Sequence, residues 1–257
     1  MMPSFFIAHG APTIVLEQHA YTEFLKGFAR EIPSPSGIVV FSAHWESPVQ
    51  MIGSSDGPYA TIYDFYGFPD EMYQLTYPAP GDPSLSEKVQ TLLASHSIQS
   101  RLDDKRGLDH GAWTILKVMV PEADIPVVAL SVNRSLTNQE QYNIGKALSE
   151  LREQNVLIIG SGGTVHNLRR VNWNASQADA WAAAFDGWLQ EKLEAWDTGA
   201  LFHYRESAPY ALEAVPTNEH FIPLLLAMGS GDAVRKAELK FRGYQHGNLS
   251  LSCWQFH

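Results

Sequence analysis

Short apolar runs recur along the 257-residue chain and predict the strands of a buried sheet. A run of four to eight apolar residues is typical of a strand that is covered on both faces. The end of the chain differs, because apolar and polar residues alternate there as in antiparallel edge strands. The strands predicted in this way are residues 3–8, 38–42, 99–104, 125–132, 156–159, 240–244 and 248–255.

Segments with helical spacing of apolar residues separate most of these strands. The predicted helices are residues 13 or 17 to 30, 82–95, 114–120, 137 or 138 to 153, 174–196, 204–211 and 218–228. The first strand, helix and strand predict a parallel pair with a right-handed crossover. The alternation continues without a repeat or linker, so we expect a single catalytic domain over residues 1–257. Its fold class is α/β, with three α/β/α layers and a central sheet that is mostly parallel or mixed.

Residues 53–84 interrupt this alternation with a long irregular segment that is rich in tyrosine, phenylalanine, glycine and proline. Loops of this length inside a compact domain are usually functional. We interpret residues 63–69 as part of a lid or pocket wall, or equally as a dimer contact. The sequence does not decide between a monomer and a small homo-oligomer.

Composition narrows the range of partners and locations. The net charge of −10 argues against binding nucleic acid or an anionic membrane through the overall field of the protein. No apolar run approaches the roughly 18 residues of a membrane span, and the start of the chain lacks the features of a signal peptide. The single cysteine, Cys253, excludes an intrachain disulfide and a cysteine-based zinc site. We therefore expect a cytoplasmic protein.

Histidines beside small residues are the candidate chemistry of the chain. Each is more often structural when considered alone, but several follow predicted strands, whose ends share one edge of an α/β sheet. A glycine-rich turn, residues 160–163, precedes one of them. Small neighbours leave room for an ion and a substrate, so we expect the group to converge on one metal. The candidates are His9, His44, His110, His166 and His220, whereas His19, His96, His203, His246 and His257 lack this context.

Five motifs together resemble one family, although each motif alone is weak. They are Ala8-His9-Gly10-Ala11-Pro12, Ser42-Ala43-His44-Trp45, the stretch from Gly107 to Trp113, the stretch from Gly160 to Leu168, and Glu219-His220-Phe221-Ile222-Pro223-Leu224. Their order and spread over nearly the whole chain resemble the DODA-type extradiol aromatic ring-opening dioxygenases. These are relatives of the catalytic subunit of protocatechuate 4,5-dioxygenase and include the 4,5-DOPA extradiol dioxygenases.

The resemblance implies roles for the five candidate histidines. His9, His44 and His220 would be metal ligands, with His220 at the place where many extradiol enzymes have a carboxylate. We favour His220 over the neighbouring Glu219. His166 would be the catalytic base and His110 a second catalytic histidine; whether His166 also ligates the metal is left open.

The resemblance also implies the cofactor and the substrates. Activity would need Fe(II), although three imidazoles suit Zn(II) in the same site as well. The partners would be O2 and a small catechol similar to DOPA.

Two other classes of function use the same histidines. One is a zinc-dependent hydrolase, and the other is a non-enzymatic binding protein on the same scaffold. A nucleophilic Ser161 is a weaker reading, because the Gly-x-Ser-x-Gly pattern is absent.

Overall fold

Eight strands pair into one sheet in the computed structural model, which describes all of residues 1–257. The order across the sheet is β4-β3-β5-β2-β6-β1-β8-β7. The four central strands, β5, β2, β6 and β1, are parallel, whereas β3 and β8 run antiparallel to the central strands beside them. The strands are β1 (Ser4–Ala8), β2 (Gly37–Glu46), β3 (Gln50–Gly53), β4 (Ser100–Asp103), β5 (Val127–Val132), β6 (Val156–Gly162), β7 (Ala237–Gln245) and β8 (Leu249–Phe256).

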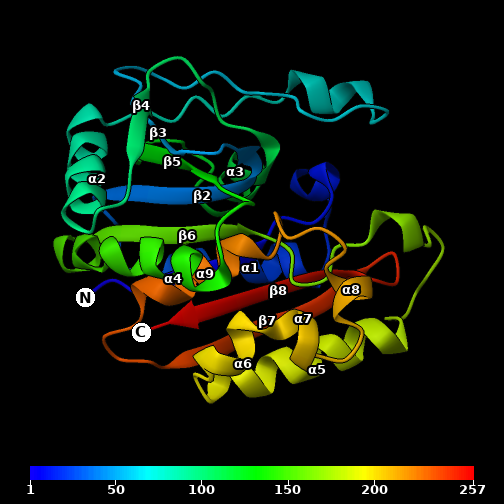
Figure 1. Cartoon of the computed structure of the whole chain (residues 1–257). Coiled ribbons are helices and arrows are strands. Elements are labelled where there is room, and N and C mark those ends of the chain that lie inside the picture. Colours follow the sequence, from blue (N-terminus) through cyan, green and yellow to red (C-terminus); the bar gives the residue numbers. More distant parts are fainter.

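Helices cover both faces of this mixed sheet, which confirms the predicted three-layer α/β class (Figure 1). One face packs against α1 and α3, and the other packs against α2, α4, α9 and the group from α5 to α8. The helices are α1 (Ala20–Glu31), α2 (Pro83–Ser95), α3 (His110–Met119), α4 (Asn138–Ala147), α5 (Ala180–Glu194), α6 (Thr198–Phe202), α7 (Tyr204–Ser207), α8 (Ala211–Ala214) and α9 (Ile222–Ser230). Short 3-10 turns lie at Pro12–Val15, Asp70–Gln74, Ser149–Gln154 and Leu168–Arg170.

The order of the strands corrects two expectations about pairing. β1 and β2 are parallel but do not pair, because β6 lies between them and pairs with both. Every residue of β6 is buried, so this late strand belongs at the centre of the sheet. β8 was expected at an edge, but it lies between β1 and β7, and of the last two strands of the chain only β7 is at an edge. β3, with only four residues, was not predicted.

Several element boundaries differ from the predicted ones for local reasons. α1 begins at Ala20 because the side chain of His19 accepts a hydrogen bond from the backbone N–H of Thr22 and caps the helix. α3 begins at His110, four residues early, because the carboxylate of Asp109 caps it. α5 and α9 begin at Ala180 and Ile222, later than predicted. The segment predicted as one helix from residue 204 forms two short helices, α7 and α8.

The aromatic segment has neither an α-helix nor a long strand, as predicted. It runs between β3 and α2 with only a 3-10 turn, at Asp70–Gln74, and Figure 1 shows it in cyan along the top of the molecule. Tyr63 and Phe65 pack against the core on the α3 side. These contacts attach the segment to the α3 side of the sheet.

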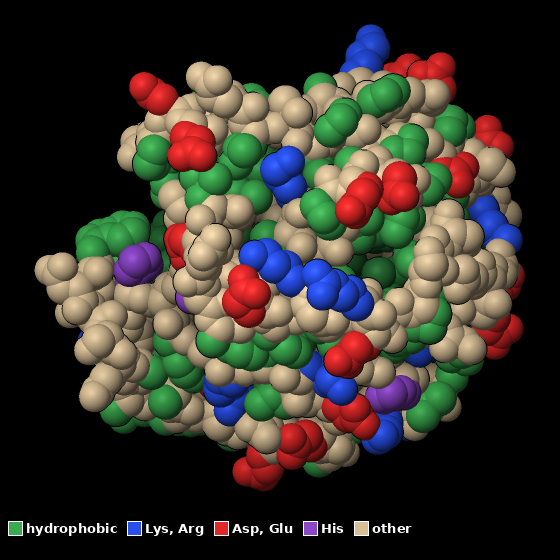
Figure 2. Space-filling view, turned by 180° about the vertical axis from the view of Figure 1, so that it is seen from behind, with side chains coloured by type: hydrophobic (Ala, Val, Ile, Leu, Met, Phe, Trp, Pro, Cys, Tyr) green, Lys and Arg blue, Asp and Glu red, His purple; other side chains and the backbone are tan.

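The two termini lie side by side, since Ser4 of β1 pairs with Phe256 of β8 (Figure 1). The face seen in Figure 2 mixes acidic and basic side chains and carries no extended basic patch. None of the helices combines the length and the apolar character that a membrane crossing requires.

Candidate metal centre

Three imidazoles from distant parts of the chain meet at the carboxyl edge of the central strands. His9 directly follows β1, His44 lies near the end of β2, and His220 lies in the turn before α9. The Nε2 atom of His44 is 3.1 Å from Nε2 of His9 and 3.2 Å from Nε2 of His220. The structure thus brings together the three residues that the sequence predicted as metal ligands.

The outer nitrogen of each ring faces a group that favours a proton on that nitrogen. The hydroxyl of Ser161 donates to the carbonyl oxygen of Gly111, so it accepts from Nδ1 of His9 at 3.0 Å. Carboxylate oxygens lie 3.3 Å from Nδ1 of His44 and 3.2 Å from Nδ1 of His220; they belong to Asp64 and Glu219 respectively. A neutral ring with its proton on Nδ1 presents a bare lone pair on Nε2.

Three Nε2 lone pairs that face one another are better explained by a bound metal ion than by hydrogen bonds among the three rings. A hydrogen bond between two of these Nε2 atoms would need a proton that the outer partners hold on Nδ1. Metal–nitrogen bonds of about 2.1 Å separate neighbouring ligands by about 3.0 Å in an octahedron and about 3.4 Å in a tetrahedron. The observed separations of 3.1 and 3.2 Å lie between these values. The donor set therefore fits one divalent cation.

Burial keeps these rings neutral, as ligation requires. It lowers the pKa of His9 and His220 well below the usual histidine value, and the neighbouring imidazoles lower the pKa of both further. Burial also lowers the pKa of His44 to about 3 although Asp64 and Glu219 oppose the shift. At neutral pH, metal binding at these three residues releases no proton from an imidazolium.

His166 and His110 each contact one of the three imidazoles. The ring of His166 stacks on His220 with 3.6 Å between centroids and 9° between planes. The ring of His110 lies 3.9 Å from that of His44, centroid to centroid. Burial lowers the pKa of His166 to about 4, so this ring is also neutral at pH 7. All five predicted histidines therefore form one cluster.

Glycines let the chain bring these segments together. β6 continues to Gly162, beyond the predicted end at residue 159, and the turn containing His220 packs directly on it. A Cβ atom on Gly162 would lie 2.1 Å from the carbonyl oxygen of His220, and one on Gly160 would lie 2.0 Å from that of Pro223. The close approach that the sequence suggested for these glycines is confirmed, whereas the sharp turn is not found at Gly160 and Gly162, because both lie within β6.

An irregularity in β2 helps to aim His44. The pairing of β2 with β5 shifts register between Phe41 and Glu46, and His44 lies within this interval. Such irregularities are common next to active sites, where they redirect a side chain. Gly111 packs against the same point, since a Cβ there would lie 2.9 Å from Cδ2 of His44.

The other five histidines lie outside the cluster, as expected. His19 caps the start of α1, and His96 and His203 lie at the carboxyl ends of α2 and α6. His246 lies in the turn between β7 and β8. His257 contacts Gln255 near the end of the chain.

Three contacting groups were not predicted from the sequence. Ser161 and Glu219 contact ligand candidates from the outside, although they were considered as a nucleophile and a ligand. Asp64 was not singled out at all, yet it hydrogen-bonds His110 and lies beside His44. The only available signal was an acidic residue inside an aromatic segment, which does not reveal a contact 46 residues away.

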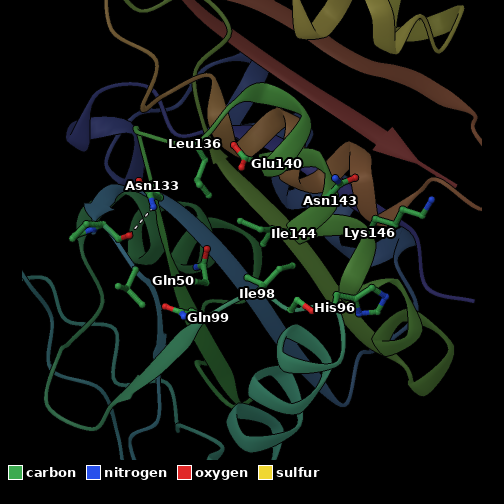
Figure 3. Close-up of a pocket in the computed structure, with 13 residues that line it drawn as sticks. Gln50, His96, Ile98, Gln99, Asn133, Leu136, Glu140, Asn143, Ile144 and Lys146 are labelled. Atoms are coloured by element: carbon green, nitrogen blue, oxygen red, sulfur yellow. Dashed lines mark hydrogen bonds between the residues drawn. The ribbon is translucent and has the colours of Figure 1, made fainter.

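A separate cavity on the face of α2 and α4 holds none of these residues. It has a volume of about 570 Å³ and lies between the carboxyl end of α2, the start of β3 and α4 (Figure 3). Its charged groups already have partners, since Lys146 pairs with Asp232 at 2.8 Å and Glu140 accepts hydrogen bonds from Thr137. The histidine cluster, with its convergent uncommitted donors, is the better candidate for the functional site.

Comparisons with known proteins find a matching family model and several relatives. A family model described as the catalytic LigB subunit of aromatic ring-opening dioxygenase matches residues 3–252. Proteins named 4,5-DOPA dioxygenase extradiol from Beta vulgaris and Portulaca grandiflora are 41% and 40% identical to this chain; each match covers 98% of it, and 96% and 95% of those proteins. A protein of the same name from Escherichia coli K12 is 36% identical over 97% of this chain and 93% of its own length.

A solved structure extends the likeness to the fold. The crystal structure of an uncharacterized protein from Escherichia coli K12 superposes with a TM-score of 0.85 at 32% identity. The superposition covers 100% of both chains. The arrangement of strands and helices that carries the histidine cluster is therefore shared with that protein.

Proposed function

The chain belongs to the family of the catalytic LigB subunit of aromatic ring-opening dioxygenases, and from this premise we propose that it cleaves a DOPA-like catechol with Fe(II). It is an extradiol ring-cleavage dioxygenase. We propose that residues 1–257 act as one catalytic domain, located in the cytoplasm. The relatives named for 4,5-DOPA support the choice of substrate class.

The convergence of three bare Nε2 atoms is the observation that carries the metal assignment. His9, His44 and His220 would hold the ion and leave its other face open. A bound Fe(II) would bring the two phenolic oxygens and O2 together and supply the redox chemistry that O2 requires. Zn(II) fits the same three nitrogens but has no redox chemistry, which favours iron for this reaction.

His166 is the proposed general base. Its ring is buried, neutral at pH 7 and stacked on His220, so it lies next to the proposed metal position without occupying it. A neutral imidazole can accept the proton that a catechol releases on binding. Because burial weakens this base, the phenol must be acidified in the site before the proton moves.

His110 is the proposed partner for oxygen. Its ring lies 3.9 Å from that of His44, centroid to centroid, and only 5% of His110 is exposed. Its ring can take up a proton released in the site and pass it to the oxygen that is being reduced. In the balanced reaction, the ring bond beside the two hydroxyls breaks and both atoms of O2 enter the product, a semialdehyde acid.

An oxygen-electrode screen of catechols tests this function. The protein is loaded anaerobically with Fe(II), and DOPA and other catechols are then added in air-saturated buffer. We expect one O2 consumed per catechol and a yellow product with DOPA, and no uptake by the Zn(II)-loaded protein. Absence of O2 uptake with every catechol, although iron is bound, would contradict the proposal.

A further inference from the structure

One carboxylate of the aromatic segment contacts two histidines of the cluster. Asp64 Oδ2 accepts a hydrogen bond from Nδ1 of His110 at 3.0 Å and lies 3.3 Å from Nδ1 of His44. Asp64 Oδ1 accepts from the backbone N–H of His110 at 2.9 Å. Neither Nδ1 atom has another acceptor in the protein. A single side chain thus faces a proposed metal ligand and a proposed catalytic residue together.

The backbone around Asp64 is fixed on both sides. The N–H of Ile62 donates to Leu108 O at 2.8 Å, and its carbonyl oxygen accepts from the indole of Trp113 at 3.1 Å. The hydroxyl of Tyr63 donates to Leu75 O at 2.8 Å. The ring of Phe65 packs edge-on to His110 with 5.7 Å between centroids. The carboxylate therefore has a defined position, and its side chain is only 23% exposed.

Helix capping alone does not account for this arrangement. The carboxylate of Asp109 already caps α3, through the N–H of Ala112. Asp64 Oδ1 adds one further backbone contact at the start of the helix, but Oδ2 points at the two imidazoles instead. A purely structural role would not require an oxygen placed between two rings.

From this geometry we infer that Asp64 is a positioning residue that sets the tautomers of both His44 and His110. A carboxylate accepts hydrogen bonds but donates none, so it favours the proton on Nδ1 of each ring. The Nε2 lone pair of His44 is thereby free for the metal, and Nε2 of His110 is left able to take up a proton released in the site and pass it to the reacting oxygen. The inference rests on the proposed function. It connects the aromatic segment to the chemistry of the histidine cluster.

Asp64→Asn tests the inference, because it keeps the size of the side chain and exchanges an acceptor for a donor. If the amide oxygen keeps its bond to the backbone of His110, the amide N–H groups face both Nδ1 atoms. The protons then move to Nε2, where they block ligation by His44. We expect Fe(II) affinity to fall about 10–100-fold, as for other groups behind metal-bound histidines. We expect kcat to fall roughly 10²-fold or more, with a smaller change in KM.

The tautomers themselves can be read by ¹⁵N NMR of histidine-labelled, Zn(II)-loaded protein, because Zn(II) is diamagnetic. We expect His110 to carry its proton on Nδ1 in the wild type and on Nε2 in Asp64→Asn. Asp64→Ala, which introduces no donor, should populate both tautomers and lose less metal affinity than Asn. Asp64→Glu restores a carboxylate and should recover part of the affinity. Asp56→Asn, with no hydrogen-bond partner, is the matched control.

The possible results separate this inference from the proposed function. An unchanged His110 tautomer in Asp64→Asn, together with metal affinity within twofold of the wild type, would overturn the role of Asp64. If the wild-type protein binds iron but cleaves no catechol, the proposed function fails. The tautomer and affinity measurements still decide the role of Asp64 in that case.

Discussion

Three neutral imidazoles at one metal leave its positive charge uncompensated by the ligands themselves, unlike two histidines with a carboxylate. Here the negative charge that the ligands lack comes from carboxylates near the outer nitrogens of the ligand rings. Glu219 contacts the outer nitrogen of His220, and Asp64 lies beside that of His44. Carboxylates in this position raise the basicity of a ligating imidazole. A catecholate that binds the open face would supply further negative charge.

His166 should be separable from the metal by mutation. His166→Ala removes the proposed base but none of the three Nε2 atoms that face one another. We expect full iron content with kcat lowered by roughly 10²-fold or more, measured by metal analysis and O2 uptake. His96→Ala, at the exposed end of α2, is the control. A near-normal rate for His166→Ala would remove this residue as the base.

Individual residues were predictable where their own neighbours carried the signal. A histidine next to glycine or alanine at a strand end can be recognised locally, which is why His9 and His44 were identified. Asp64 could not be recognised, because its importance comes from a contact with His110 across the fold. The side-chain partners of His9 and His44, which set their tautomers, come from remote segments for the same reason.

At the scale of elements, the glycines of β6 control how closely the turn before α9 approaches. Gly162→Ala would place a methyl group against the carbonyl oxygen of His220. We expect a loss of about 1–3 kcal/mol of stability together with weaker metal binding, measured by urea denaturation and metal titration. Gly187→Ala is a matched control in α5, where a Cβ meets nothing within 4 Å. Unchanged metal binding in Gly162→Ala would contradict this account of the glycine.

The contact between α4 and the end of α9 should make the stability of the protein depend on pH. Asp232, just after α9, accepts hydrogen bonds from Tyr142 and Lys146 of α4 at 2.6 and 2.8 Å. Burial raises the pKa of Asp232, but these donors and Arg235 outweigh it and lower the pKa to about 2. The carboxylate therefore stabilises the fold above pH 4, and this contribution is lost as the pH falls towards 2.

Asp232→Asn should show this dependence directly. We expect the variant to be about 1–2 kcal/mol less stable than the wild type at pH 6, with the difference closing between pH 4 and pH 2. Chemical denaturation at several pH values measures it, and the exposed Asp104→Asn is the control. A difference that stays constant down to pH 2 would show that the charge of Asp232 is not what stabilises the contact.

Element type was easier to predict from the sequence than element pairing. The apolar runs identified the central strands because burial on both faces requires them to be apolar throughout. Pairing was missed where a strand from late in the chain enters the sheet, as β6 does between β1 and β2. The end of β6 was missed because glycine is a poor strand former, and its role there is close packing.

At the scale of the whole molecule, the candidate site exists only in the assembled fold. Its proposed ligands are residues 9, 44 and 220. Residues 9 and 44 lie near the ends of parallel strands at one edge of the sheet, and the turn before α9 brings residue 220 to the same edge. The aromatic segment contacts the histidine cluster through Asp64 and Phe65, which both contact His110. Substrate, O2 and metal would therefore meet at the edge of the sheet, where the sheet and the helical layers on its two faces come together.

The most direct test of this account is anomalous diffraction at the iron edge from crystals loaded anaerobically with Fe(II). We predict a single strong peak about 2.1 Å from Nε2 of each of His9, His44 and His220, with the rings of His166 and His110 beside it. A peak at another group of residues, or no peak from protein that binds iron and turns over catechol, would contradict the central claim.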